Sequence, residues 1–326
     1  MKQLNLLVLV FYSFSALAQD VSLALQKAPS LAEETMQMQW KEVPASVQLS
    51  FANSNVRYAQ EIVPDLKLQN TTLLTGWKGE KVHAQLLVWS KVDVPTLTVS
   101  ISDLQTSTGQ KISNENSSVG FVEYVKTDEF KSGCGYRKPE NFDSSLVADR
   151  INTLEKRAVV KPNKVQPVWV SINIPATVPG GLYSGIITIK ADRTYRLKLF
   201  VKVIDKTLPP PSQWTFNLDL WQHPAAVARV HGVKLWSDEH YALLKKYYTL
   251  LARAGQKNIT VSIVNEPWNH QTYDDYPGLI KWIKRKDGSW KYDYTLFDHY
   301  VSFVMSCGIR QRINCYSMVP WKIAFQ

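Results

Sequence analysis

The sequence predicts a multidomain fold of the β and α/β classes, with an antiparallel β-sandwich followed by an incomplete (β/α)8 TIM-type barrel. Two observations favour this prediction. Short runs in which apolar and polar residues alternate fill the chain as far as Leu208, a pattern typical of half-buried antiparallel strands. After the consecutive prolines at 209–211 the pattern changes to strand, helix, strand, helix and strand, which is the order of parallel βα units.

The prolines therefore divide the chain. We expect a signal peptide over residues 1–18, an N-terminal β-sandwich domain over 19–208, a proline-rich linker over 209–213 and the first part of a barrel over 214–326. A complete barrel of this type takes roughly 250 residues, and fewer than half that number lie between the linker and Gln326. We expect about three barrel strands and a truncated carboxyl end.

The first residues have the features of a secretory signal. Lys2 supplies the positive charge, residues 4–17 supply the apolar stretch, and Ala16-Leu17-Ala18 supplies the small residues of a cleavage site. We therefore expect a secreted protein, either periplasmic or on the outer surface. The apolar stretch is shorter than the ~20 residues that cross a bilayer, so we predict no membrane span.

The net charge of +10 admits several anionic partners. The basic residues are dispersed, apart from a cluster at 281–291 (KWIKRKDGSWK) that Trp282 and Trp290 interrupt. Because no nucleic-acid reading motif accompanies this charge, we predict no nucleic-acid partner and favour a glycan. The three cysteines lack the spacing of a disulfide framework or a metal site, and we predict neither a metal nor a cofactor: Cys134, Cys307 and Cys315.

Alternating runs and turn residues define the first domain. Clear alternation occurs in residues 82–88, 98–102, 168–174 and 195–203. The turn sequence Pro179-Gly180-Gly181 precedes a further run at 182–189, which predicts a hairpin there. Several short strands with regular turn signals predict a sandwich of two sheets.

The second domain begins with a strand at 215–221. A helix is expected from the N-cap Ser237 to Gly255, followed by a strand at 259–264. The next connection contains Asp287-Gly288, a dipeptide that favours a type I′ hairpin turn. A second helix with a capping box is expected from Thr295 to Gly308, and a third strand at 312–317.

Each of the three predicted strands ends in a segment that contains tryptophan and proline. In βα barrels the loops at the carboxyl ends of the strands build the active site. An indole ring presents an apolar face and one donor, which suits a pyranose. A single tryptophan of this kind is more often packed in the core, but three in corresponding places indicate a sugar-binding mouth. The candidate substrate-binding residues are Asp219, Trp221, His223, Glu266, Trp268, Asn269, Tyr316 and Trp321.

Several segments resemble secreted glycoside hydrolases of family 123. They are FNLDLWQHP at 216–224, the run from 227 to 260, NEPWNHQTYD at 265–274 and INCYSMVPW at 313–321. The segment PVWVSINIPATVPGGLYSGIITI at 167–189 resembles the end of that family's N-terminal β-sandwich. The resemblance covers most of the mature chain, but only the first part of the family's architecture.

The resemblance implies a β-N-acetylgalactosaminidase or a similar hexosaminidase. It implies a retaining mechanism in which the 2-acetamido group of the substrate attacks the anomeric carbon, an exception to the two-carboxylate scheme. In the family an adjacent Asp-Glu pair serves this mechanism, and the resemblance implies that this pair lies beyond Gln326. The pair Asp238-Glu239 is explained by its place in the first turn of a helix. We therefore expect a glycoside hydrolase fragment without its catalytic residues, inactive by itself.

Glu266 is the one alternative candidate for catalysis. Asn265-Glu266-Pro267 matches the acid/base signature of another group of barrel glycosidases, in which it follows the fourth strand. Here it follows the second strand, so contact with sugar hydroxyls is the favoured role. Two other hypotheses stay open for the whole chain: a non-catalytic secreted carbohydrate-binding protein that uses the β-sandwich, and a structural or adhesion protein.

Overall fold

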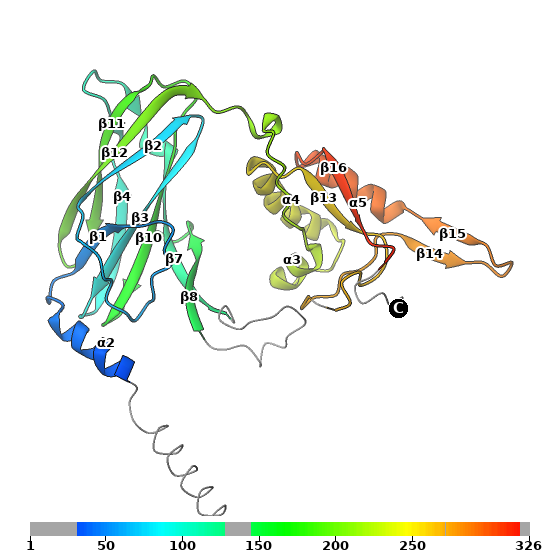
Figure 1. Cartoon of the computed structure of the whole chain (residues 1–326), viewed down its shortest axis with the longest axis horizontal. Helices are drawn as coiled ribbons and strands as arrows, with labels where there is room; N and C mark the ends of the chain where they lie inside the picture. Colours follow the sequence, from blue (N-terminus) through cyan, green and yellow to red (C-terminus); the bar gives the residue numbers. More distant parts are fainter. Residues whose placement is uncertain (1–30, 128–144, 271, 320–326) are drawn as a thin grey trace, which may run out of the picture. The chain divides into compact units, whose positions relative to one another are not determined.

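The structure is a computed structural model that describes residues 31–127, 145–270 and 272–319. These residues divide into two compact units, and the main boundary lies between Thr207 and Leu208. Figure 1 colours the first unit from blue to green and the second from yellow-green to red. Three sets of predicted features lie outside the described residues: the signal peptide at 1–18, Cys134, and the carboxyl-terminal residues that include Trp321 and Gln326.

The first unit is built mainly of strands. Among the described residues, the helix α2 (Leu31–Glu42) precedes them, and a 3-10 turn, η1 (Asn114–Asn116), lies between strands. The strands are β1 (Gln48–Ala52), β2 (Thr71–Lys78), β3 (Lys81–Ser90), β4 (Val94–Ile101), β5 (Leu104–Gln105), β6 (Lys111–Ile112), β7 (Ser117–Thr127), β8 (Ser145–Asn152), β9 (Ala158–Val160), β10 (Lys164–Asn173), β11 (Gly181–Lys190) and β12 (Thr194–Thr207).

These strands form two sheets. One is five-stranded, in the order β1-β3-β10-β7-β8. The other is seven-stranded, with the path β2-β12-β11-β4-β9 and with β5 and β6 attached at β11. The described pairs are antiparallel except that β2 runs parallel to β12. The prediction of a β-rich unit with antiparallel sheets is confirmed.

One apolar core lies between the two sheets. Its residues come from the predicted alternating faces, including Val168, Val170 and Ile172 on β10 and Leu199 and Val201 on β12. Each of these side chains is fully buried, and burial of such a side chain contributes about 1.5–3 kcal/mol. Period-two alternation thus predicted the inward faces of β10 and β12 correctly.

Two details of the first unit differ from the prediction. The turn at 179–181 does not close a hairpin, because β10 pairs with β3 and β7 whereas β11 pairs with β12 and β4. The chain crosses there from one sheet to the other, and the hairpin is the one between β11 and β12. The helix α2 also lies in a region expected to be entirely β. Its sequence of strong helix formers, with Glu33 and Glu34 in the first turn and Lys41 in the last, explains it.

The second unit contains helices and parallel strands. Its elements are η3 (Pro211–Gln213), α3 (Pro224–His231), α4 (Asp238–Arg253), β13 (Asn258–Ser262), β14 (Lys281–Lys284), β15 (Trp290–Asp293), α5 (Thr295–Ser306) and β16 (Arg312–Tyr316). Strands β13 and β16 pair in parallel from Asn258↔Arg312 to Ser262↔Tyr316. The core of this unit packs α4 and α5 against β13 through residues that include Leu244, Tyr248, Ile259, Tyr300 and Val304.

The first predicted strand of this unit, residues 215–221, is reduced to a single parallel bridge between Leu218 and Gln256. Beyond the bridge, two glutamine side chains replace the backbone ladder. The Oε1 atom of Gln256 accepts from the Leu220 amide at 2.8 Å, and the Oε1 atom of Gln222 accepts from the Thr260 amide at 2.7 Å. The segment therefore lies beside β13, joined to it through side chains. Its membership of a (β/α)8 barrel stays a prediction.

The predicted helix ends are confirmed for α4. The Ser237 hydroxyl accepts from the His240 amide at 3.3 Å, and Gly255 beyond the last turn has a left-handed φ of 91°. The capping box predicted for α5 is wrong. The N-cap position is occupied by Tyr294, and the Asp293 carboxylate accepts from the Thr295 amide at 3.0 Å instead. An Asx turn one residue earlier thus begins this helix.

The hairpin predicted around Asp287-Gly288 exists, but its turn differs. Strands β14 and β15 pair from Lys281↔Asp293 to Lys284↔Trp290. A type I′ turn needs a positive φ at both central residues, and of the pair only Gly288 has one, at 85°. The Gly288 amide donates to the Arg285 carbonyl at 3.1 Å and the Arg285 amide to the Ser289 carbonyl at 2.8 Å. This longer loop places Arg285 and Lys286 of the basic cluster at the tip of the hairpin.

Cys307 is buried and Cys315 is exposed, and both are free thiols. In the part of the chain that the structure describes, no helix is both long enough and apolar enough to cross a bilayer.

Candidate functional site

Three aromatic rings meet at the carboxyl ends of the parallel segments. Trp221 follows the Leu218 bridge, Trp268 lies in the loop after β13, and Tyr316 is the last residue of β16. The ring centroids are 5.4 Å apart for Trp221 and Trp268, 5.1 Å for Trp221 and Tyr316, and 5.0 Å for Trp268 and Tyr316. Because parallel strands end at one edge of a sheet, residues far apart in the sequence come together here.

The three rings differ in exposure. Trp221 is 54% exposed and Trp268 is 4% exposed. The Trp221 ring is therefore accessible to solvent, while the buried Trp268 ring packs against it. The indole N–H of Trp268 is buried and has no hydrogen-bond partner among the described residues. Buried polar atoms without partners are uncommon in proteins, so this unpaired N–H calls for an explanation at the site.

Tyr276 and His223 form a second aromatic layer, which the sequence did not predict as a whole. The Tyr276 ring packs edge-on against Trp268 at 4.4 Å and lies 4.2 Å from the His223 ring. Its hydroxyl donates to the carbonyl of Gln222. Tyr276 therefore links the loop after β13 to the segment that carries Trp221. It was missed because it lies ten residues beyond the Asn-Glu-Pro sequence and no motif marks it.

His223 presents a buried acceptor. Its Nε2 atom lies 3.2 Å from the carbonyl oxygen of Asp274, and since a carbonyl only accepts, Nε2 carries the proton. Burial lowers the pKa of His223, although the Asp274 carbonyl opposes this shift. The neutral ring then leaves a lone pair on Nδ1, which is buried and has no partner among the described residues.

Asp219 presents a second acceptor of this kind. Its Oδ2 atom accepts from the Asn314 amide at 2.8 Å, while Oδ1 is buried and unpartnered among the described residues. The carboxylate also acts on a ring of the aromatic cluster. Burial raises the pKa of Tyr316, and the negative charge of Asp219 raises it further. Asp219 is thus placed close to the cluster, as its position before Trp221 suggested.

Glu266 has a different environment from the one expected of an acid/base. It is 2% exposed, and its carboxylate accepts from the backbone amides of Tyr276 and His270. Glu266, Asn269 and His270 all have positive φ values, of 49°, 53° and 57°. The carboxylate therefore stabilises a tight loop whose backbone is strained, and this loop carries Trp268.

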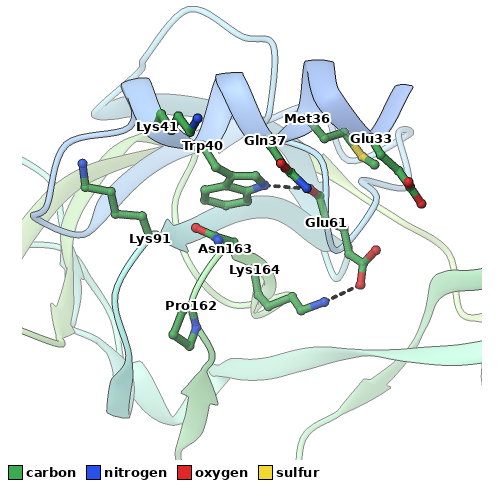
Figure 2. Close-up of a pocket in the computed structure, with 10 residues that line it drawn as sticks. All are labelled: Glu33, Met36, Gln37, Trp40, Lys41, Glu61, Lys91, Pro162, Asn163 and Lys164. Atoms are coloured by element: carbon green, nitrogen blue, oxygen red, sulfur yellow. Dashed lines mark hydrogen bonds and ion pairs between the residues drawn. The ribbon is translucent and has the colours of Figure 1, made fainter. Parts of the chain in front are cut away.

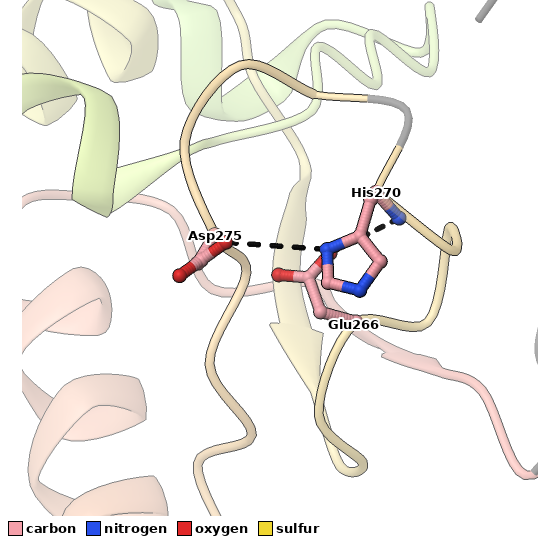
Figure 3. Close-up of side chains that lie close together, drawn as sticks. All are labelled: Glu266, His270 and Asp275. Atoms are coloured by element: carbon pink, nitrogen blue, oxygen red, sulfur yellow. Dashed lines mark hydrogen bonds and ion pairs between the residues drawn. The ribbon is translucent and has the colours of Figure 1, made fainter. Parts of the chain in front are cut away.

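Figure 3 shows Glu266, His270 and Asp275 side by side in this loop. The Nδ1 atom of His270 is 3.5 Å from the Glu266 carboxylate and 4.0 Å from that of Asp275. Such residues can ligate a divalent cation, and within the described ranges they form the one such group found. Both oxygens of Glu266 accept from backbone amides of this loop, whereas His270 and Asp275 are exposed. We interpret the group as loop scaffold.

The first unit has a large groove, which bears on the alternative that the β-sandwich binds glycan. Figure 2 shows the residues that line it beneath α2. Its volume is about 710 Å³. The Trp40 indole lies in it, but only 5% of this residue is exposed and its N–H donates to the Glu61 carbonyl at 2.7 Å. Lys164 pairs with the Glu61 carboxylate. The groove therefore lacks the open ring face that sugar stacking requires.

The other predicted residues are placed as follows. Asn269 is half-buried in the loop described above, and Trp321 lies outside the described residues. Of the eight candidates, the structure brings Asp219, Trp221, Trp268 and Tyr316 together. It adds Asn314 and Tyr276 to them.

Comparisons with known proteins identify the family. Residues 51–191 match the N-terminal domain of glycoside hydrolase 123, and residues 221–326 match the glycoside hydrolase 123 catalytic domain. The chain belongs to glycoside hydrolase family 123. The family resemblance predicted from the sequence is therefore confirmed. The aromatic cluster of this family 123 chain lies within the match to the catalytic domain, which continues as far as Gln326.

A solved relative agrees with this assignment. The family 123 chain is similar to a family 123 glycoside hydrolase from Clostridium perfringens, a structure described for its glycolipid glycan hydrolysis, with 27% identity and a TM-score of 0.77. The match covers 85% of this chain and 49% of that one, so the chain spans about half of the relative's length. A PapD-like domain of human CEP192 matches 50% of the chain at 12% identity and a TM-score of 0.26. A comparison with curated proteins found no match.

Proposed function

We propose that this family 123 chain binds the amino sugar of a β-N-acetylhexosaminide at the aromatic cluster. The observation that carries the proposal is the meeting of Trp221, Trp268 and Tyr316 beside two buried acceptors without donors, on Asp219 and His223. Exposed indole matches the apolar face of a pyranose. Sugar hydroxyl groups and an acetamide N–H are donors of the kind that the two acceptors lack.

The family supports a retaining, substrate-assisted reaction as the chemistry of the complete site. In such a reaction the acetamido oxygen of the substrate bonds to the anomeric carbon while a carboxylic acid protonates the departing glycosidic oxygen. Water then attacks the anomeric carbon, breaks its bond to the acetamido oxygen and gives a proton back to the carboxylate. An adjacent Asp-Glu pair serves this reaction.

No residue of this chain is assigned to that pair. Within the described residues the adjacent pair is Asp238-Glu239, which is exposed in the first turn of α4. Glu266 is bound to the amides of its own loop. The placing of the pair beyond Gln326 stays a prediction, which the 49% coverage of the longer relative supports. We therefore propose that the chain binds sugar without turnover.

We further propose that the second unit is the first part of a (β/α)8 barrel and that the protein is secreted. The Leu218 segment, β13 and β16 run in parallel, which supports their being the first strands of a (β/α)8 barrel. The charged, apolar and small-residue segments of residues 1–18 support secretion. Expression with and without these residues, followed by cell fractionation, tests the second point, since removal should retain the protein in the cytoplasm.

The binding proposal is tested by calorimetric titration of the full chain with N-acetylgalactosamine. We expect Trp221→Ala and Asp219→Asn each to weaken binding at least about fivefold, because one removes a stacking face and the other a charged acceptor. Trp77→Ala is the matched control, since Trp77 is exposed on the other unit, 41% against 54% for Trp221. If the control weakens binding as much as Trp221→Ala, the sugar does not lie on the cluster. Rapid hydrolysis of an aryl β-N-acetylgalactosaminide would contradict binding without turnover.

A further inference from the structure

The hairpin of β14 and β15 is a separate feature that the proposed sugar site does not use. Every residue of β14 and the first three of β15 are exposed. Figure 1 shows the hairpin projecting from the helices of its own unit. It belongs to the connection between β13 and α5, and the Trp282 indole N–H ties it to the Ile263 carbonyl at 2.8 Å. The hairpin thus starts at the same end of β13 as the loop that carries Trp268.

Aromatic rings cover one face of this hairpin. The register places Trp282 opposite Tyr292 and Lys284 opposite Trp290, so these four side chains share a face. Trp282 packs edge-on against Trp290 at 6.3 Å and against Tyr292 at 5.0 Å. Trp290 is 48% exposed. These contacts fix the rings to one another and leave indole surface open to a partner.

Basic residues outnumber acids along the same hairpin, with five against Asp287 and Asp293. None of its five basic residues makes an ion pair with a described residue: Lys281, Lys284, Arg285, Lys286 and Lys291. The two acids nearby hold turns, since the Asp287 carboxylate accepts from Ser289 and that of Asp293 from Thr295. Lys284 lies over the Trp290 ring at 5.9 Å. Unpaired cations around rigid rings attract an anionic partner that also offers faces for stacking.

We propose that this hairpin is a second glycan-contacting element, which binds the carboxylate- or sulfate-bearing part of an acidic saccharide. The charge selects the acidic groups and the aromatic face stacks on the sugar rings between them. An acidic glycan fits better than a membrane, because the tip of the hairpin is the polar sequence Arg285-Lys286-Asp287-Gly288-Ser289 rather than an apolar one. The proposal rests on the proposed function only in assuming a glycan partner.

The test measures how tightly the unmodified full chain and two triple variants bind chondroitin sulfate. Each variant removes three positive charges, so the two variants have the same net charge. The hairpin variant carries Lys284→Gln, Arg285→Gln and Lys286→Gln. The control carries Arg196→Gln, Lys198→Gln and Lys202→Gln, three cations that are exposed on β12 and also make no ion pair with described residues. We expect the hairpin variant to lose at least about tenfold in affinity at low salt and the control less than about twofold.

A second variant isolates the role of the aromatic face. Trp290→Ala leaves the charge unchanged, and we expect it to weaken binding of chondroitin sulfate by about fivefold at any salt concentration. Equal losses in the hairpin and control variants would show that charge alone attracts the polymer and would overturn the proposal. It would also be overturned if oligothymidylate, or vesicles containing phosphatidylglycerol, bound in a hairpin-dependent way and more tightly than the glycan.

Failure of this proposal is distinguishable from failure of the sugar site. The hairpin variant should bind N-acetylgalactosamine as the unmodified chain does, because its substitutions lie on exposed residues outside the aromatic cluster. Circular dichroism and the thermal midpoint should also be unchanged. Loss of neutral sugar binding in the hairpin variant would mean that the two elements are one site, against the proposal.

Discussion

Replacing Gln222 by leucine should release the Leu218 segment from β13. The Gln222 side chain is 3% exposed. Its Oε1 atom accepts from the Thr260 amide at 2.7 Å, and its amide nitrogen donates to the Leu220 and Asn258 carbonyls. Leucine has a similar volume, so the substitution removes these bonds with little change in packing.

The expected cost follows from which groups lose their partners. The Leu220 and Asn258 carbonyls keep a donor, because the Gln256 amide lies 3.1 and 2.7 Å from them. The Thr260 amide loses its acceptor and is buried, with 1% of the residue exposed. An unsatisfied buried amide costs about 1–3 kcal/mol and each lost hydrogen bond about 1 kcal/mol. We therefore expect the free energy of unfolding of this unit to fall by about 2–4 kcal/mol.

Hydrogen exchange at the Thr260 amide measures this directly. A loss of 2–4 kcal/mol corresponds to roughly 30- to 1,000-fold faster exchange in a peptide that contains β13. Gln311→Leu is the control, since Gln311 is exposed and its bond to the described residues runs through its backbone amide. Less than about threefold faster exchange at Thr260 would refute the reasoning, because it would mean that the Gln222 side chain does not hold the segment.

Two further perturbations test the helix ends of the second unit. Gly255→Ala should cost more than Gly232→Ala, because both glycines have positive φ but a Cβ on Gly255 would lie 2.6 Å from the Trp214 ring, whereas one on Gly232 meets nothing within 4 Å. We expect about 1–2 kcal/mol for Gly232→Ala and at least about 1 kcal/mol more for Gly255→Ala in urea unfolding, and equal costs would contradict this. Acid should also destabilise the unit through His240, whose Nε2 lies 2.9 Å from the Pro224 carbonyl and whose Nδ1 accepts from an amide. Burial lowers the pKa of His240, so the unfolded chain binds the proton first. This stabilisation is complete above about pH 6.5 and is lost as the pH falls toward the lower folded pKa. His240→Gln should flatten that part of the stability profile, and an unchanged profile would exclude His240 as its source.

The elements that the sequence predicted well are those in which one local rule decides the outcome. Period-two alternation identified the buried faces of β10 and β12, since the side chains of a strand point alternately to its two sides. Ser237 and Gly255 marked the ends of α4 for equally local reasons. Helix α3 was missed although Pro224 at its first position and Gly232 beyond its last are signals of the same kind. Its eight residues were too short to show a helical period.

The elements predicted less well depend on partners distant in the sequence. Whether residues 215–221 form a backbone ladder or a ladder of glutamine side chains depends on Gln256, more than thirty residues away. The turn at 179–181 has the same composition whether it closes a hairpin or crosses between sheets. That choice depends on which strands already flank β10 on both sides. Local turn chemistry predicts that the chain turns at 179–181, but it does not predict with which strand the next segment pairs.

The candidate site contains features that the sequence predicted and one feature that it did not. Trp221 and Trp268 were predictable as neighbours, because each follows a parallel segment and such segments end at one edge. The third predicted ring, Trp321, lies outside the described residues, and Tyr316 at the end of β16 completes the cluster. The role of Glu266 was not, because Asn-Glu-Pro suggests catalysis while the carboxylate in fact accepts from two amides of its own loop. These bonds hold a backbone with three left-handed residues other than glycine, a conformation that is uncommon for a residue such as Glu266. The buried carboxylate thus acts on the aromatic cluster indirectly, by holding the loop that positions Trp268.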